Sequence, residues 1–284
     1  MNDSGPYLDY LRPRGLNWIK TTLRVTVAVQ CFGAAAQWLS AGTASPITEF
    51  LISDMQWSEA QAVQLDDGVA YGLLACGVLT LVRPSWPMLL LVTLWFTATS
   101  LTSILHEIDL KAVLVPIEQA IRSLAPLGLL VLDFWPPKLK SHLGRTVITM
   151  WLLRLGLAVT FAGLGLVALL QSVTSGPLLE VVRTIVSAGG MSNLSDETVR
   201  MILAGVGGIE LALSFNLLAS RSKPLLAMTA LWGFCSAALP MVSLGFAGFP
   251  ESLVRFAEGG VAVVLLLYFS LSIREFPPEV VAEN

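Results

Sequence analysis

The chain has 284 residues, of which 55% are hydrophobic and only 13% are charged. Soluble domains carry about 25% charged residues, so this composition, with a mean hydropathy of +0.72, excludes an ordinary soluble globular protein. The formal net charge of −3 averages over two faces of opposite charge and identifies no soluble partner. The lipid bilayer is the expected partner, and nothing in the sequence indicates nucleic acid.

Eight apolar stretches recur along the chain, each close to the roughly 20 residues that cross a bilayer as a helix. In chain order they are 18–39, 64–81, 88–105, 112–132, 147–170, 201–219, 225–244 and 253–273. A buried soluble core is the alternative, but polar residues gather at the ends of these stretches. The sequence therefore predicts an all-α, polytopic membrane protein with eight transmembrane helices.

Two shorter helices are predicted in the loops after the first and fifth stretches. Pro46 and Pro177 each fit the first turn of a helix, and apolar residues follow on one side of each segment. This pattern indicates short helices lying on the outer membrane surface.

The basic residues give the orientation. If the N-terminus is cytoplasmic, the five lysines and arginines on the outer side are Lys111, Arg122, Arg183, Arg200 and Arg255. The other twelve of the 17 fall on the inner side, as the positive-inside rule requires. We expect both termini to lie in the cytoplasm.

An internal repeat divides the chain. Residues 21–29 recur as 151–159 with a spacing of 130, and the pair Pro46 and Glu49 recurs as Pro177 and Glu180 with a spacing of 131. The predicted fold is thus two repeated four-helix bundles. Its parts are a cytoplasmic segment (1–16), unit A (17–134), a cytoplasmic linker (135–146), unit B (147–273) and a cytoplasmic tail (274–284).

The fourth span of each unit is the part where the repeat becomes ambiguous. Arg122 aligns with Arg255 at a spacing of 133, whereas the Pro-Pro sequences that follow the two spans need a spacing of 141. Glu118 and Arg122 therefore lie either on an outer amphipathic segment or inside the membrane.

Five residues are candidates for an intramembrane polar layer: Glu210, Arg154, Arg24, Trp95 and Trp232. An ionisable group near the middle of a span is by default a candidate site. Glu210 is the strongest, about 13 Å from the inner end of its helix.

The leading hypothesis is structural: Arg24 and Arg154 are basic anchors that extend toward the inner surface, and Glu210 pairs with Arg154 to lock two helices together. In the alternatives, Glu210 has a ligand-binding or proton-linked role, or it makes no contact. Leu73 replaces the glutamate in unit A, so Arg24 is expected to share Glu210 or to bind an anionic ligand.

Motifs for catalysis are missing. Cys31, Cys76 and Cys235 form no C-x-x-C pair, and His106 and His142 are predicted at opposite membrane faces. We expect no metal, no cofactor and no catalytic residue, which argues against an enzyme.

Residues 152–165, the outer Pro177-x-x-Glu180 segment and Gly-Ile-Glu210-Leu-Ala-Leu resemble the DoxX family of four-span bacterial membrane proteins. That family typically has R-L-x-L-G in its first span and G-x-x-E in its second. The resemblance implies a bacterial inner-membrane protein with a four-helix bundle per unit. Through relatives that associate with quinone-linked redox complexes, it also implies quinone as a cofactor or other membrane subunits as partners.

Three functions follow from these observations. The first is a membrane subunit or a binder of a lipid-like or quinone-like ligand. The alternatives are a quinone-linked oxidoreductase subunit and a small-solute transporter, because duplicated bundles can form a site at their interface.

Overall fold

The computed structural model describes residues 8–11, 13–40, 45–106, 109–134, 142–174, 176–190 and 195–275. Most of the predicted linker and tail, and residues 1–7 of the first segment, lie outside them. The elements are β1 (Leu8–Leu11), α1 (Pro13–Ser40), α2 (Pro46–Ser53), α3 (Glu59–Val82), α4 (Trp86–His106), α5 (Leu110–Glu118), α6 (Ala120–Phe134), α7 (His142–Val173), α8 (Pro177–Ala188), α9 (Asp196–Ala219), α10 (Lys223–Leu244), η1 (Gly245–Gly248), α11 (Phe249–Leu271) and β2 (Ser272–Glu275). The expected helical fold is confirmed, with one short strand pair beside it.

Six helical segments of the described chain are long and apolar enough to cross a membrane. They are Glu59–Val82, Trp86–Leu105, Leu110–Phe134, Gly144–Val173, Asp196–Ala219 and Lys223–Leu271. The last contains both α10 and α11. The 28-residue helix α1 is not among the six. The predicted count of eight is therefore not confirmed by these segments.

The predicted short helices after the first and fifth apolar stretches are present as α2 and α8, and each begins at the proline that predicted it. α2 begins at Pro46, and the Ser45 hydroxyl accepts a hydrogen bond of 3.1 Å from the Thr48 amide. α8 begins at Pro177, and the Gln171 side chain accepts one of 2.9 Å from the Leu178 amide. Proline suits a first turn because the missing N–H has no helical partner there.

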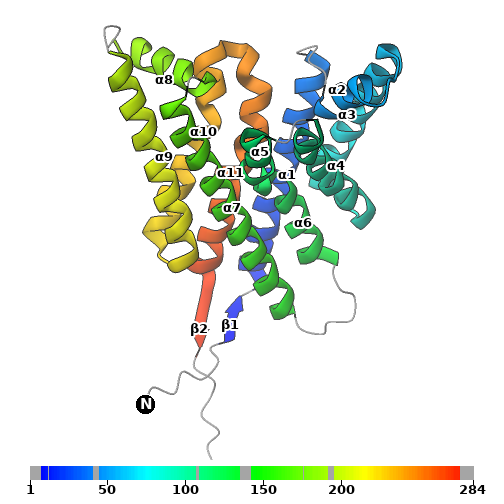
Figure 1. Ribbon diagram of the computed structural model, residues 1–284. Helices are drawn as coiled ribbons and strands as arrows, with labels where there is room; N and C mark the ends of the chain where they lie inside the picture. Colours follow the sequence, from blue (N-terminus) through cyan, green and yellow to red (C-terminus); the bar gives the residue numbers. More distant parts are fainter. Residues whose placement is uncertain are drawn as a thin grey trace, which may run out of the picture.

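The two chain ends meet in an antiparallel strand pair. Leu8 lies opposite Glu275, and Leu11 lies opposite Ser272. This pairing places the start of α1 and the end of α11 at one end of the bundle, which we call the termini end (Figure 1). α2 and α8 lie at the opposite end, which we call the far end.

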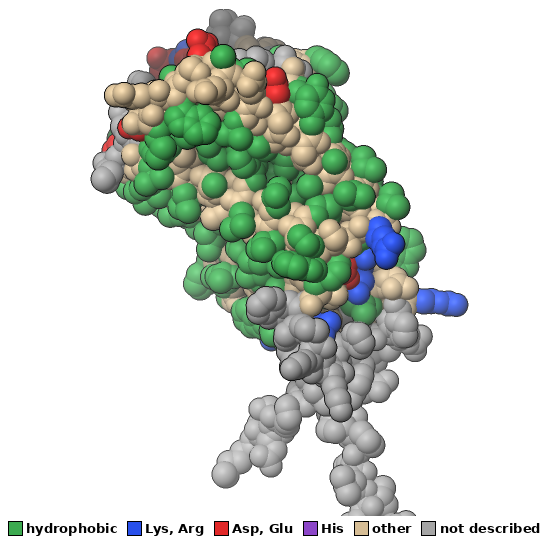
Figure 2. Space-filling model, turned by 90° about the vertical axis from the view of Figure 1, so that its right-hand side faces the viewer, with side chains coloured by type: hydrophobic (Ala, Val, Ile, Leu, Met, Phe, Trp, Pro, Cys, Tyr) green, Lys and Arg blue, Asp and Glu red, His purple; other side chains and the backbone are tan. Residues whose placement is uncertain are grey.

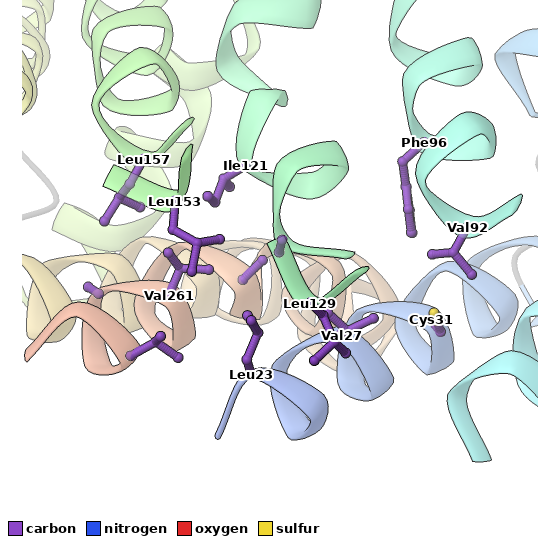
Figure 3. Close-up of a cluster of buried hydrophobic side chains, with 14 of the residues drawn as sticks. Leu23, Val27, Cys31, Val92, Phe96, Ile121, Leu129, Leu153, Leu157 and Val261 are labelled. Carbon is purple, nitrogen blue, oxygen red and sulfur yellow. The ribbon is translucent and has the colours of Figure 1, made fainter. Parts of the chain in front are cut away.

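Four helices form the middle of the molecule. α1 packs on α11 and α6 packs on α7, while α3 and α4 flank one side and α9 and α10 the other (Figure 1). The core between them is aliphatic: Leu23 and Val27 of α1, Leu129 of α6, Leu157 of α7 and Val261 of α11 are fully buried (Figure 3).

The outer surface of the flanking helices is apolar. Tyr71, Val78 and Leu94 are among many large hydrophobic side chains that face outward on α3 and α4. Figure 2 shows this apolar belt between acidic side chains near the far end and basic ones near the termini end. Contiguous exposed apolar surface of this extent is typical of a lipid-facing protein.

Candidate functional site

A cavity of about 280 Å³ lies between α7, α8, α9 and α10. Its walls are mostly aliphatic, with Leu178, Val182 and Ile185 contributed by α8 at the far end. Its polar lining comes from Glu210, Trp232, Ser236 and Arg255, with the sulfur of Cys235 beside them. An apolar cavity with a few convergent polar groups is the usual form of a small-molecule site.

The wall formed by α7 and α9 depends on two glycines that cross at close range. A Cβ atom on Gly165 would lie 2.8 Å from the carbonyl oxygen of Gly207, and the reverse contact is also 2.8 Å. Two turns away, the Ser214 hydroxyl donates a 2.7 Å hydrogen bond to the Ala158 carbonyl. This close crossing fixes the face of α9 that carries Glu210.

Glu210 is buried, with 6% of its surface exposed. One carboxylate oxygen accepts a long hydrogen bond of 3.4 Å from the indole nitrogen of Trp232. No salt bridge reaches Glu210 from the residues that the structure describes. The structure therefore brings these two predicted residues together at the polar end of the cavity.

The predicted pair between Glu210 and Arg154 is wrong. The Arg154 guanidinium instead donates to the carbonyls of Leu217, Leu218 and Ser220 at the end of α9, at 3.1 Å to Leu218 and 2.6 Å to Ser220. It also lies 5.1 Å from the Trp151 ring centroid. The last carbonyls of a helix have no internal partner and carry partial negative charge, so they supply the counter-charge expected from Glu210.

The expectation that Arg24 has no acidic partner in its own half is also wrong. Its guanidinium forms a 2.9 Å salt bridge with Asp133 at the end of α6, and Lys20 bonds the same carboxylate at 2.8 Å. Three charges thus tie α1 to α6 near the termini end. Arg24 does not share Glu210 and is not left for an anionic ligand.

Trp95 occupies a different environment from Trp232. It packs edge-to-face on Trp38, with ring centroids 5.5 Å apart, and its indole nitrogen is buried without a hydrogen-bond partner. The predicted five-residue layer therefore separates into an α9–α10 pair, two arginines near the termini end and an aromatic contact in unit A.

A cluster of charges connects the two halves of the chain where α6 meets α11. Arg122 of α6 donates to Glu251 of α11 at 2.8 Å, and Arg255 donates to the same oxygen at 2.9 Å. Glu258 accepts a 3.2 Å hydrogen bond from Ser236. With Glu118, whose charge interacts with Arg122 and Arg255, these residues form what we call the charge cluster: Glu118, Arg122, Glu251, Arg255 and Glu258.

Glu118 and Arg122 both belong to the helical run 110–134, which by length and composition is apolar enough to cross a membrane. The run is interrupted at Gln119, between α5 and α6.

Helix α7 packs against the point where α5 ends and α6 begins. The hydroxyl of Thr160 accepts a 2.9 Å hydrogen bond from the Ile121 amide at the start of α6. A Cβ atom on Gly163 would lie 2.5 Å from the amide nitrogen of Glu118, so only glycine allows this approach. From the other side, Gln30 of α1 donates a 2.6 Å bond to the Arg122 carbonyl.

None of the five cluster residues was among the predicted site residues, and Glu118 and Arg122 were left with two placements, yet the sequence carried a signal for them. Glu118 and Arg122 recur as Glu251 and Arg255, an E-x-x-x-R pattern repeated at a spacing of 133. In each pair the glutamate and the arginine are four residues apart, or about one helical turn. Charged side chains in apolar helices cost free energy unless they contact partners of opposite charge. That cost could have identified the contact between the fourth spans.

Long apolar helices with charges held between them define the class of helical membrane protein. Among the described residues, no group of three or more His, Cys, Asp or Glu could hold a metal ion. No family model, curated protein or solved structure matches the chain.

Proposed function

We propose that the protein is a membrane-embedded binding protein for an amphipathic molecule, lipid-like or quinone-like in having an apolar body and one polar group. The apolar body lies against α8 and the aliphatic walls, and the polar group meets Glu210 and Trp232. The observation that carries this proposal is the cavity itself, whose walls are mostly aliphatic and whose lining includes four polar residues, Glu210 and Trp232 in contact among them. Ligand sites commonly have this composition.

The cavity offers little to a hydrophilic solute. Burying a polar group without a hydrogen bond costs about 1–3 kcal/mol in proteins, and the walls formed by Leu164, Val181 and Val206 have no polar side-chain atoms. A molecule with several hydroxyl groups would lose water along these walls and gain nothing in return. An apolar body gains free energy there as it leaves water.

Filling the cavity tests the proposal. Val206→Trp places an indole in the part of the cavity wall that α9 contributes. Ile209→Trp, three residues further along the same helix, places an indole at a position that faces outward. We expect a photoactivatable diazirine alkanol to label the cavity walls of the wild type, as mapped by peptide mass spectrometry. Val206→Trp should reduce that labelling several-fold and Ile209→Trp should leave it unchanged. Labelling confined to outward-facing side chains in all three proteins would refute a ligand cavity.

We further propose an architecture of eight spans in two DoxX-like units. The helix contacts support a repeat, because α1 and α7 each pack on the last long helix of the other half. Gly33 and Gly163, which are 130 residues apart, occupy corresponding contacts: Gly33 lies against Pro250 and Leu253, and Gly163 lies against Glu118. The helices α10 and α11 within the longest apolar run supply one of the two additional spans, and α1 supplies the other.

The orientation that we propose is a cytoplasmic termini end in a bacterial inner membrane. Arg83 and Arg221, in the tight turns after α3 and α9, and Arg154 all lie toward that end, as the positive-inside rule favours. Reporter fusions after Asn284 and after Gly190 should give opposite signals for cytoplasmic and external location. Equal signals would contradict the eight-span topology.

A transporter is the second candidate, favoured by one observation. The interruption at Gln119 and the charge cluster lie at the contact between the two halves, and interrupted helices at such contacts form transport sites in other membrane proteins. A quinone-linked oxidoreductase subunit rests on the family resemblance alone.

A further inference from the structure

We infer that the polar group of the ligand is a cation, so that the cavity takes a lipophilic monocation such as an arylalkyl ammonium ion, in competition with a proton on Glu210. This inference rests on the proposed function, because it names the class of molecule that the cavity would bind. Three observations carry it: the buried carboxyl group of Glu210, which has no salt bridge within the described chain, the excess of acids around it and the aromatic residue beside it.

Glu210 is the first observation. Its carboxyl group is buried and lines the cavity, yet its sole hydrogen bond within the described chain is the long one from Trp232. It lies nine residues from the termini end of α9, which places it about 14 Å inside that end. A carboxylate at such depth is unfavourable unless a counter-charge or a proton accompanies it.

The neighbouring charges do not supply that counter-charge in full. The charged groups that interact with Glu210 are Arg255 and Glu258 of α11 and Glu118 of α5. Arg255 is the one basic residue of the lining, and its Nε atom already donates to Glu251. Together with the charge cluster, Glu210 makes four carboxyl groups against two guanidinium groups.

An acidic excess of this kind attracts a cation or retains protons. Charges at short range in a low-dielectric interior interact far more strongly than in water, so four ionised carboxylates with two counter-charges are not stable together. The walls contributed by α7 and α8 provide no further charge, since the residues that line the cavity from those helices are aliphatic. A proton on a carboxyl group or a cation from outside the chain therefore balances the excess, and the two compete.

Trp232 adds selectivity for an organic cation. Its indole lines the cavity next to Glu210, and indole is the aromatic side chain that attracts cations most strongly. A hydrated metal ion would gain little from aliphatic walls. An ammonium ion that carries an apolar body matches the carboxylate, the indole and the walls at once.

The depth of the polar end argues against the choline group of a membrane lipid. Headgroups lie at the membrane surface, outside a hydrocarbon core about 30 Å thick. Glu210 lies near the middle of a helix that is 24 residues long. We therefore commit to a free monocation as the occupant.

The test compares benzyltrimethylammonium with its neutral carbon isostere, neopentylbenzene, on the purified full-length protein by isothermal titration calorimetry and by competition. We expect the cation to bind at least about tenfold more tightly, a difference of about 1.4 kcal/mol. Its affinity should rise from mildly acidic to mildly alkaline pH, because protonation of Glu210 removes the negative charge. Binding should also release protons, which is measured as a dependence of the heat on the buffer.

Two variants and one control complete the experiment. Glu210→Gln keeps the shape of the side chain and should abolish both the preference for the cation and its pH dependence. Trp232→Phe should weaken cation binding several-fold more than it weakens neopentylbenzene binding, because the indole attracts the charge and both ligands share its apolar surface. Glu180→Gln removes an exposed carboxylate that pairs with Arg183 on α8 and should change neither. The pH dependence is measured on the wild type, so the test stands even if Glu210→Gln fails to fold.

The outcomes separate the inference from the proposed function. Equal binding of the cation and its isostere, or binding of the cation that does not depend on pH, would overturn the cationic ligand and leave the amphipathic cavity standing. Displacement of the cation by short-chain phosphatidylcholine below its micelle concentration would assign the site to a lipid headgroup and overturn the free monocation. Failure of both probes to bind, together with alkanol labelling insensitive to Val206→Trp, would remove the proposed function as well.

Discussion

Gly163→Ala and Gly33→Ala should each destabilise the protein by about 1–3 kcal/mol, the usual range for an overpacked core. A Cβ atom on Gly163 would lie 2.5 Å from the Glu118 amide nitrogen, and one on Gly33 would lie 2.6 Å from the Val254 amide nitrogen. The contacted atoms are backbone, so no side-chain rotation relieves the overlap. The helices must separate, and each separation opens the contact between the two halves of the chain.

Gly72→Ala and Gly208→Ala are the matched controls, because no atom lies within 4 Å of a Cβ at either position. In those helix interiors alanine should be neutral or stabilising by up to about 1 kcal/mol, since glycine is the poorer helix former. The measurement is the midpoint of thermal unfolding in one detergent for all four variants. A similar shift for buried and open glycines would contradict the close helix contacts described above.

Glu251→Gln should be the most damaging single change to a charged residue. Glu251 accepts from both Arg122 and Arg255, and neutralising it leaves two guanidinium groups without their shared partner. Breaking a fully buried ion pair from one side typically costs about 3–5 kcal/mol. The Glu251 side chain is 26% exposed, so we expect a cost below that range, and less still where an arginine can extend to the membrane surface. Because the two arginines belong to different halves of the chain, the loss should also weaken the junction of α6 and α11.

The control for Glu251→Gln is again Glu180→Gln, whose exposed pair with Arg183 should contribute no more than about 1 kcal/mol. Thermal unfolding measures both variants. Adding Arg122→Leu to Glu251→Leu should recover part of the lost stability, because removing both partners of a buried pair can be nearly neutral. If the double variant is as unstable as the sum of the two single ones, the Arg122–Glu251 contact has no energetic role.

Much of the fold could be predicted because it depends on local composition. Long apolar stretches must be helical in a bilayer, where every backbone polar group needs an internal partner. Pro46 and Pro177 marked the starts of two short helices, as the structure confirms. Residues such as Leu23, Leu157 and Val261 belong to apolar stretches, and they are buried in the core.

The candidate site could be predicted in part. Glu210 and Trp232 were chosen because polar groups are unusual at that depth, and the structure places them in contact at the cavity. Their partners could not be assigned by depth alone. Arg154 lies at a level that suited Glu210, yet it binds the final carbonyls of α9, because backbone groups at a helix end carry no signature in the side-chain sequence.

The sequence by itself determined that this chain is helical and apolar, where its short helices begin and which of its residues are chemically unusual. These properties depend on residue type and on neighbours within one or two helical turns. The tertiary structure alone decided which charges meet, as in the Arg24–Asp133 and Arg122–Glu251 pairs across 109 and 129 residues. It also decided that a cavity opens beside Glu210. Pairing and cavity shape depend on which helix faces pack together, and an apolar helix in lipid carries little amphipathic signal to show which of its faces is buried.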